Sequence, residues 1–153
     1  MKDSLLTGLL VIAGWAVVHF LSEARERRKE TRAQLDKLIE RLFLLEKTAH
    51  DFFCSEKFDH SKAVFIQSEI ERIEARALRM FTGKYTDALI PQIKFHRRSL
   101  TLNYFEDSSF KQQPSNSIFL QEITETTRDY EEALEYIYSL KYPYPPKLLS
   151  FFK

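Results

Sequence analysis

Glycine is the residue that this sequence most lacks, with three copies in 153 residues, whereas an average protein has about 7%. Tight hairpins, small barrels and phosphate-binding loops depend on the backbone freedom of glycine. With Gly8, Gly14 and Gly83 as the complete set, neither G-x-G-x-x-G nor G-x-x-x-x-G-K-[ST] occurs. The sequence therefore predicts an all-helical fold of one modest domain and excludes a P-loop enzyme.

The sequence also has few cysteines and a small net charge. A single Cys excludes an internal disulfide and a Cys-based zinc cluster. The 23 basic and 22 acidic side chains nearly cancel, so we expect no duplex nucleic acid as a partner. The four His residues are scattered, and Glu46 with His50 is interpreted as a helix-surface pair rather than a metal site. We expect neither a metal nor a cofactor.

Charge is absent from the run Leu5 to Leu21, which is 17 residues long. At about 1.5 Å per residue this run covers roughly 25 Å, and Ser4 and Ser22 bring it closer to the thickness of a hydrocarbon core. We predict a transmembrane signal-anchor helix at residues 4–22, with a buried core helix and a cleaved signal peptide as alternatives. Within the span we single out Leu9, Gly14, Trp15, His19 and Phe20. Leu9 contributes apolar surface, Gly14 gives a flat spot for helix association, and the three rings can reach the membrane interface.

A basic collar follows the predicted span, whereas only Lys2 and the terminal amine precede it. Positively charged residues that flank a span stay on the cytoplasmic side. We therefore predict a single-pass protein of the inner (cytoplasmic) membrane, with the N-terminus outside and the bulk of the chain in the cytoplasm. The same residues attract anionic lipid, although interleaved Glu residues reduce their net charge. The collar consists of Arg25, Arg27, Arg28, Lys29 and Arg32.

Two heptad runs predict an antiparallel helical hairpin beyond the collar. The first runs from Leu35 to Phe52 and the second from Ala63 to Met80, each in steps of 3 and 4. Asp59 or Ser61 is expected as the N-cap of the second helix, and Gly83 as its C-terminal stop. These coiled-coil-like heptads also suggest an oligomer or partner face, made of Leu35, Leu38, Leu42, Leu45, Ile66, Ile70 and Ile73.

Two further helices complete the predicted bundle of about four helices over residues 23–141. The third begins near Thr86 or at Pro91 and runs to Phe105, because a proline inside a helix favours a kink or a boundary. The fourth runs from Ile118 to about Leu140. Residues 142–153 are expected to form a Pro/aromatic tail.

The third predicted helix carries a candidate anion-binding site at Lys94, Arg97 and Arg98, close to His96. Such a cluster can hold a phosphate or a nucleotide. The alternative is that these cations pair with the acidic fourth helix inside the bundle. The helical outline resembles small RNases of the HEPN type, but no Arg stands five to seven positions before a His, so the resemblance carries over no catalytic residue.

These features predict a membrane-anchored, single-pass, non-enzymatic protein that acts through protein contacts and oligomerisation. Its expected partners are the bilayer and either a second copy or another protein. The alternative is a small membrane-disrupting effector of a toxin or phage-defence system, whose cytoplasmic bundle senses a signal; a membrane-tethered enzyme is the third possibility. The analogy to such effectors is one of layout alone.

Overall fold

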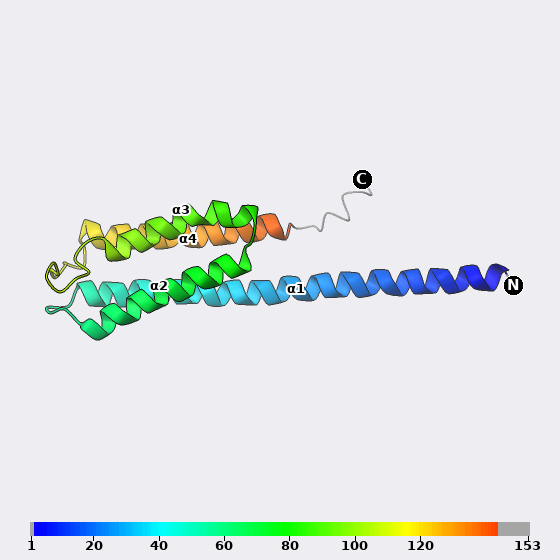
Figure 1. The fold of residues 1–153 in the computed structure, drawn as a ribbon, viewed down its shortest axis with the longest axis horizontal. Coiled ribbons are helices and arrows are strands. Elements are labelled where there is room, and N and C mark those ends of the chain that lie inside the picture. Colours follow the sequence, from blue (N-terminus) through cyan, green and yellow to red (C-terminus); the bar gives the residue numbers. More distant parts are fainter. Residues whose placement is uncertain (1, 144–153) are drawn as a thin grey trace. The chain divides into compact units, whose positions relative to one another are not determined.

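A computed structural model describes the backbone of residues 2–143 and the side chains of residue 8 and residues 10–143. Within these residues the chain is helical and contains no strand, which confirms the predicted all-helical class and the helical bundle. The predicted tail lies outside the described residues from residue 144 on. The helices are α1 (Lys2–Phe53), α2 (His60–Met80), α3 (Lys84–Thr101) and α4 (Ile118–Lys141) (Figure 1).

The chain divides into two compact units between Gln34 and Leu35. The first unit contains the N-terminal part of α1. The second contains the rest of α1 together with α2, α3 and α4. α1 runs without a break through the basic collar and the first heptad run.

The helix starts show which capping signals the chain uses. Asp59 caps α2, where its Oδ1 accepts a hydrogen bond from Lys62 N at 3.1 Å. Ser117 caps α4 in the same way, through Leu120 N at 3.3 Å. Gly83 differs from its prediction: α2 already ends at Met80, and Gly83 is the N-cap of α3 with a φ of 67°. Its positive φ is needed for the sharp turn between these two helices.

The third helix runs through Pro91 rather than starting there. α3 begins at Lys84, two residues before the predicted start near Thr86, so the alternative start at Pro91 is wrong. The proline ring is exposed, and the missing N–H leaves the carbonyl of Asp87 on the solvent side without its helical partner. The helix also ends earlier than predicted, at Thr101 instead of Phe105.

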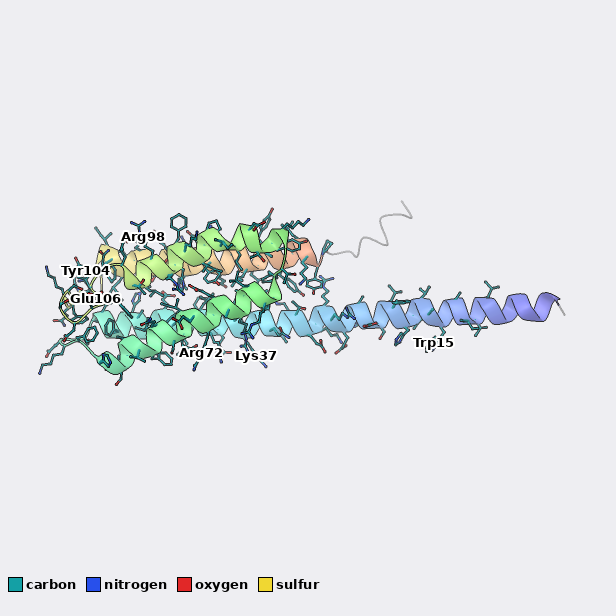
Figure 2. All side chains as sticks on the ribbon, in the orientation of Figure 1. Trp15, Lys37, Arg72, Arg98, Tyr104 and Glu106 are labelled. Atoms are coloured by element: carbon teal, nitrogen blue, oxygen red, sulfur yellow. The ribbon has the colours of Figure 1, made fainter. Side chains whose placement is uncertain are left out.

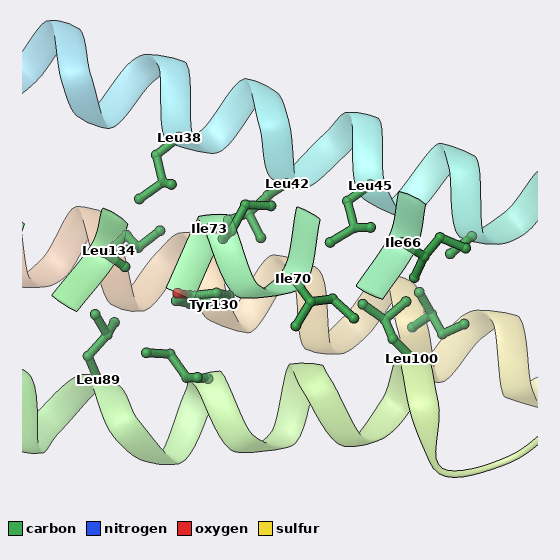
Figure 3. Close-up of a cluster of buried hydrophobic side chains, with 14 of the residues drawn as sticks. Leu38, Leu42, Leu45, Ile66, Ile70, Ile73, Leu89, Leu100, Tyr130 and Leu134 are labelled. Carbon is green, nitrogen blue, oxygen red and sulfur yellow. The ribbon is translucent and has the colours of Figure 1, made fainter. Parts of the chain in front are cut away.

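The two heptad runs form the core of the bundle. Leu38, Leu42 and Leu45 of α1 point towards Ile66, Ile70 and Ile73 of α2, and Tyr130 and Leu134 of α4 lie close by (Figure 3). All seven residues predicted as an oligomer or partner face are buried, with exposed fractions of 2% or less: Leu35, Leu38, Leu42, Leu45, Ile66, Ile70 and Ile73. The prediction of an outward face is therefore corrected, because the four-helix bundle uses this face for its own packing.

Aromatic rings close one end of the bundle. The ring of Phe52 lies 4.9 to 5.7 Å, between centroids, from those of Phe53, Phe58, Phe105 and Phe110. Edge-to-face packing of this kind adds to the free energy gained by burial. The ring cluster joins the end of α1 to the loop between α1 and α2, through Phe58, and to the segment between α3 and α4, through Phe105 and Phe110.

The other end of the bundle is held by Lys141. Its Nζ donates a hydrogen bond to the carbonyl oxygen of Met80 at 2.9 Å and lies 5.7 Å from the ring centroid of Phe81. A cation at the last carbonyls of a helix is favourable because those groups carry the negative end of the helix dipole. The C-terminal ends of α2 and α4 are thereby joined.

Candidate functional site

The first unit exposes an almost continuous apolar surface. Trp15 projects from α1 with 69% of its surface exposed (Figure 2). The large apolar side chains around it are exposed by half or more: Leu10, Val11, Ile12, Val17, Val18, Phe20 and Leu21. They occur at almost every position, so every side of the helix is apolar and no polar face is left for water.

Two features lie within this apolar segment. The rings of Trp15 and His19, one turn apart, stack with centroids 5.4 Å apart and an interplanar angle of 3°. Next to them, a Cβ built on Gly14 meets no atom within 4 Å. Gly14 therefore leaves a flat, open spot on the helix surface, and its role in helix association stays a prediction.

A membrane span is not evident in the described part of the chain, where no helix combines the required length with sufficient apolar character. Leu9 and residues 4–7 of the predicted span lie outside the described side chains.

The basic collar is largely compensated by its own acidic residues. Arg27 Nη2 lies 2.5 Å from Glu23 Oε1, one turn earlier, and Lys29 Nζ lies 3.7 Å from Glu26 Oε2. Arg28 and Arg32 also have partners. These i,i+3 and i,i+4 pairs are highly exposed and add little stability. Their effect is to lower the positive potential of the collar.

The three cations of the candidate anion site do not converge. Arg97 forms a bidentate pair with Glu74 of α2, with Nε to Oε1 at 2.8 Å and Nη2 to Oε2 at 2.5 Å. This hydrogen bonding raises the pKa of Arg97. The alternative of pairing with α4 is corrected for Arg97, whose partner is on α2. With its donors occupied by a carboxylate, Arg97 is poorly placed to bind an added phosphate.

Lys94 and Arg98 lie on the outer side of α3, both exposed (Figure 2 labels Arg98). Neither has an ion-pair partner in the described part of the chain. A small cavity of about 190 Å³ lies beside Arg97 and is lined by Gln67, Ile70, Glu71, Arg97, Thr101 and Phe105. Lys94 and Arg98 are not among its lining residues, so the three cations do not share one concave site.

His96 is buried in the core beneath these cations, with 2% of its surface exposed. Its ring packs against that of Tyr130 with centroids 5.4 Å apart. His96 Nε2 and Tyr130 Oη are both buried without a hydrogen-bond partner. Burial lowers the pKa of His96 to about 4 and raises that of Tyr130, since the charged form of each is disfavoured away from water. His96 is therefore a neutral core residue rather than part of an anion site.

Glu46 and His50 form a polar contact between helices. Thr124 of α4 donates its hydroxyl hydrogen to Glu46 Oε1 at 2.6 Å, and its Oγ1 lies 3.2 Å from His50 Nε2. The pair was predicted to lie on a helix surface, and it joins α1 to α4 there. Within the described residues, no three His, Cys, Asp or Glu side chains are grouped to hold a metal ion.

The sequence reasoning missed the exposed sides of α3 and α4. The largest exposed apolar side chains of these helices and their flanks are Phe95, Leu102, Ile118 and Tyr136, at 58% to 83% exposed. Phe95 and Leu102 are seven residues apart and Ile118 and Tyr136 are eighteen residues apart, so each pair lies on one side of its helix among charged residues. The sequence analysis followed the stronger heptad runs of α1 and α2 instead, which are buried.

Neither a protein-family model nor a curated protein nor a solved structure matches this chain. The functional argument therefore depends on the residues themselves.

Proposed function

We propose that the protein is a membrane-anchored helical interaction protein, held in the inner membrane by residues 4–22 and acting through its cytoplasmic bundle without catalysis. The observation that carries the proposal is the apolar surface of residues 10–21, exposed on every side of α1. Such a surface is unfavourable in water and marks a membrane or protein contact. A bilayer covers all sides of a helix at once, which a single protein groove cannot do.

The sequence around this surface supports the same interpretation. The charge-free run continues back to Leu5, and the collar from Arg25 to Arg32 follows it directly. An excess of Arg and Lys after the span favours a cytoplasmic bundle. Trp15 and His19 are amphipathic rings of the kind found towards a membrane interface.

Membrane retention after alkaline carbonate extraction tests the anchor. We expect the wild-type chain to remain in the membrane pellet. Ile12→Arg with Val17→Arg introduces two charges into the span, each costing up to about 3 kcal/mol near the bilayer centre, and should move the chain to the supernatant. Ala33→Arg with Gln34→Arg adds the same charge at exposed positions beyond the collar and should remain in the pellet. Release of the wild-type chain by carbonate would contradict the proposal.

Cys54 reports the orientation, because it is the single cysteine of the chain and is partly exposed near the end of α1. A membrane-impermeant maleimide should leave Cys54 unlabelled in intact spheroplasts and label it after permeabilisation. Labelling of intact spheroplasts would place the bundle on the outer side and overturn the cytoplasmic assignment.

A second candidate function is the membrane-disrupting effector, which the open surface at Gly14 favours. Under this alternative, expression collapses the membrane potential, and Gly14→Leu removes the effect by blocking close helix approach. Space around Gly14 in the single chain is ample, so this substitution does not disturb the helix itself. An intact potential during strong expression would exclude the alternative and leave the anchor proposal in place.

A further inference from the structure

The outer side of α3 carries an exposed stripe that recurs every three or four residues. We call it the α3 outer stripe; it consists of Lys84, Ala88, Pro91, Phe95, Arg98 and Leu102, all exposed. It lies on the side of α3 opposite the buried Leu89, Ile93 and Leu100. Lys94, one turn from Arg98, adds a further cation beside it. The stripe is therefore cationic, with two large apolar side chains, Phe95 at 59% and Leu102 at 58% exposed.

The outer side of α4 carries a matching stripe of opposite charge. The α4 outer stripe consists of Ile118, Glu122, Glu125, Asp129, Glu132 and Tyr136, all exposed. Its ends are apolar, with Ile118 at 83% and Tyr136 at 64% exposed. Four carboxylates spaced at three and four residues repel one another along a helix. Arg128, which lies 4.0 Å from Glu132, compensates one of them.

The two stripes occupy one outer surface of the bundle. α3 and α4 lie side by side (Figure 1), and each turns its buried residues to the same core. The hydroxyls of Ser99 and Thr126 meet at 2.7 Å and fix the antiparallel register. Counting along both helices from this contact places Arg98 and Lys94 level with the stretch from Glu125 to Glu132.

We infer that a second copy of this chain docks on this surface, with the α3 outer stripe of each copy against the α4 outer stripe of the other. A two-fold axis parallel to the helices places α3 of one copy opposite α4 of the other. Rotation about this axis does not shift the helices along their length, so residues that are level within one copy are also level across the contact. Each copy then places Lys94 and Arg98 opposite the carboxylates of its partner, in an isologous and closed contact. The apolar side chains of both stripes are buried in the same step. The inference rests on the proposed function in treating the bundle as the interacting part, and it names the partner.

Charge reversal on one stripe at a time tests this contact in the full-length chain. The α3-reversed variant is Lys94→Glu with Arg98→Glu, and the α4-reversed variant is Glu125→Lys with Asp129→Lys. In either variant like charges face each other at both contacts of the dimer. The protein mass of each, measured by light scattering during size-exclusion chromatography in dodecyl maltoside, should fall from two chains to one. We expect the dissociation constant to rise at least tenfold.

Mixing the two variants provides the decisive measurement. The α3-reversed chain carries acidic residues at the centre of both stripes, and the α4-reversed chain carries basic residues at the centre of both. An equimolar mixture should therefore restore a two-chain mass with one copy of each. Misfolded chains could not pair in this way, so the mixture also controls for folding. Lys37→Glu with Lys47→Glu makes the same change of charge at exposed positions of α1 and should leave the dimer intact.

Other outcomes overturn the inference. They are a single-chain mass for the wild type, a two-chain mass for either reversed variant alone, or a mixture that remains single-chain. If the α3-reversed variant keeps its mass but loses binding to phosphatidylglycerol vesicles, the stripe binds lipid instead of a second copy. Carbonate extraction of the same variants separates the two proposals, because a dimer that is released from the membrane contradicts the anchor and not the stripe contact.

Discussion

Acidification should destabilise the bundle through His96, and the effect can be calculated from its burial. In the folded chain the imidazole is neutral, with a pKa lowered from 6.5 to about 4 by loss of water. The unfolded chain binds a proton near pH 6.5, whereas the folded chain does so only near pH 4. The free energy of unfolding therefore falls as the pH drops from about 6.5 to about 4, and the contribution of His96 is constant above and below that window.

The size of this effect follows from the same two values. One proton taken up by the unfolded state alone changes the free energy of unfolding by about 1.4 kcal/mol per pH unit. Across the interval from 6.5 to about 4, His96 should remove about 3 kcal/mol, a large part of the 5 to 15 kcal/mol that holds a typical domain together. No ion pair of His96 in the described residues offsets this loss.

Urea unfolding of the full-length chain, followed by circular dichroism between pH 8 and pH 4, measures the effect. His96→Gln keeps a similar volume without a titratable group, and His96→Phe also removes the unpaired nitrogen. Other carboxylates titrate in the same range, so the informative quantity is the difference between the wild type and each variant. That difference should change by about 3 kcal/mol between pH 7 and pH 4. Parallel curves for wild type and His96→Gln would refute the argument from burial.

Two further predictions concern the core and the turn into α3. Leu42→Ala should lower the free energy of unfolding, measured with urea, by about 3 kcal/mol, because the side chain is fully buried and its removal leaves a cavity. Leu44→Ala is the control: this position is 54% exposed, so the free energy of unfolding should change by less than about 0.5 kcal/mol. Gly83→Ala should cost about 1 kcal/mol, because the φ of 67° at this position disfavours a Cβ; an unchanged unfolding midpoint would show that the turn does not depend on glycine.

Helical periodicity made much of the core predictable from the sequence. Leu38 and Ile70 belong to runs of apolar residues spaced at three and four positions. Such a run lies on one face of a helix, and in a bundle that face packs into the core. The role of Gly83 was less accessible, because a glycine near a helix end is equally consistent with stopping one helix and starting the next. Pro91 shows that an exposed proline can remain inside a helix where the lost hydrogen bond faces water.

The candidate sites were harder to predict than the core, because they depend on which helices become neighbours. The sequence shows that Arg97 stands in a basic stretch and that both α2 and α4 carry carboxylates, but only the order of helices in the bundle selects Glu74 as its partner. His96 differs from Arg97 by a rotation of about 100° on the helix. That rotation separates a buried neutral ring from an exposed cation.

The ring cluster at Phe52 has a consequence for how the bundle opens. Residues 102–117 between α3 and α4 contain no helix, yet Gln113 N donates to Phe53 O at 2.8 Å and Gln112 Nε2 donates to Cys54 O at 3.0 Å. With Phe110 inserted among the rings, this segment can detach only when the end of α1 also loosens. Slow amide exchange with solvent and resistance to proteases should therefore extend across the segment, which then belongs to the same cooperative opening unit as the helices it connects.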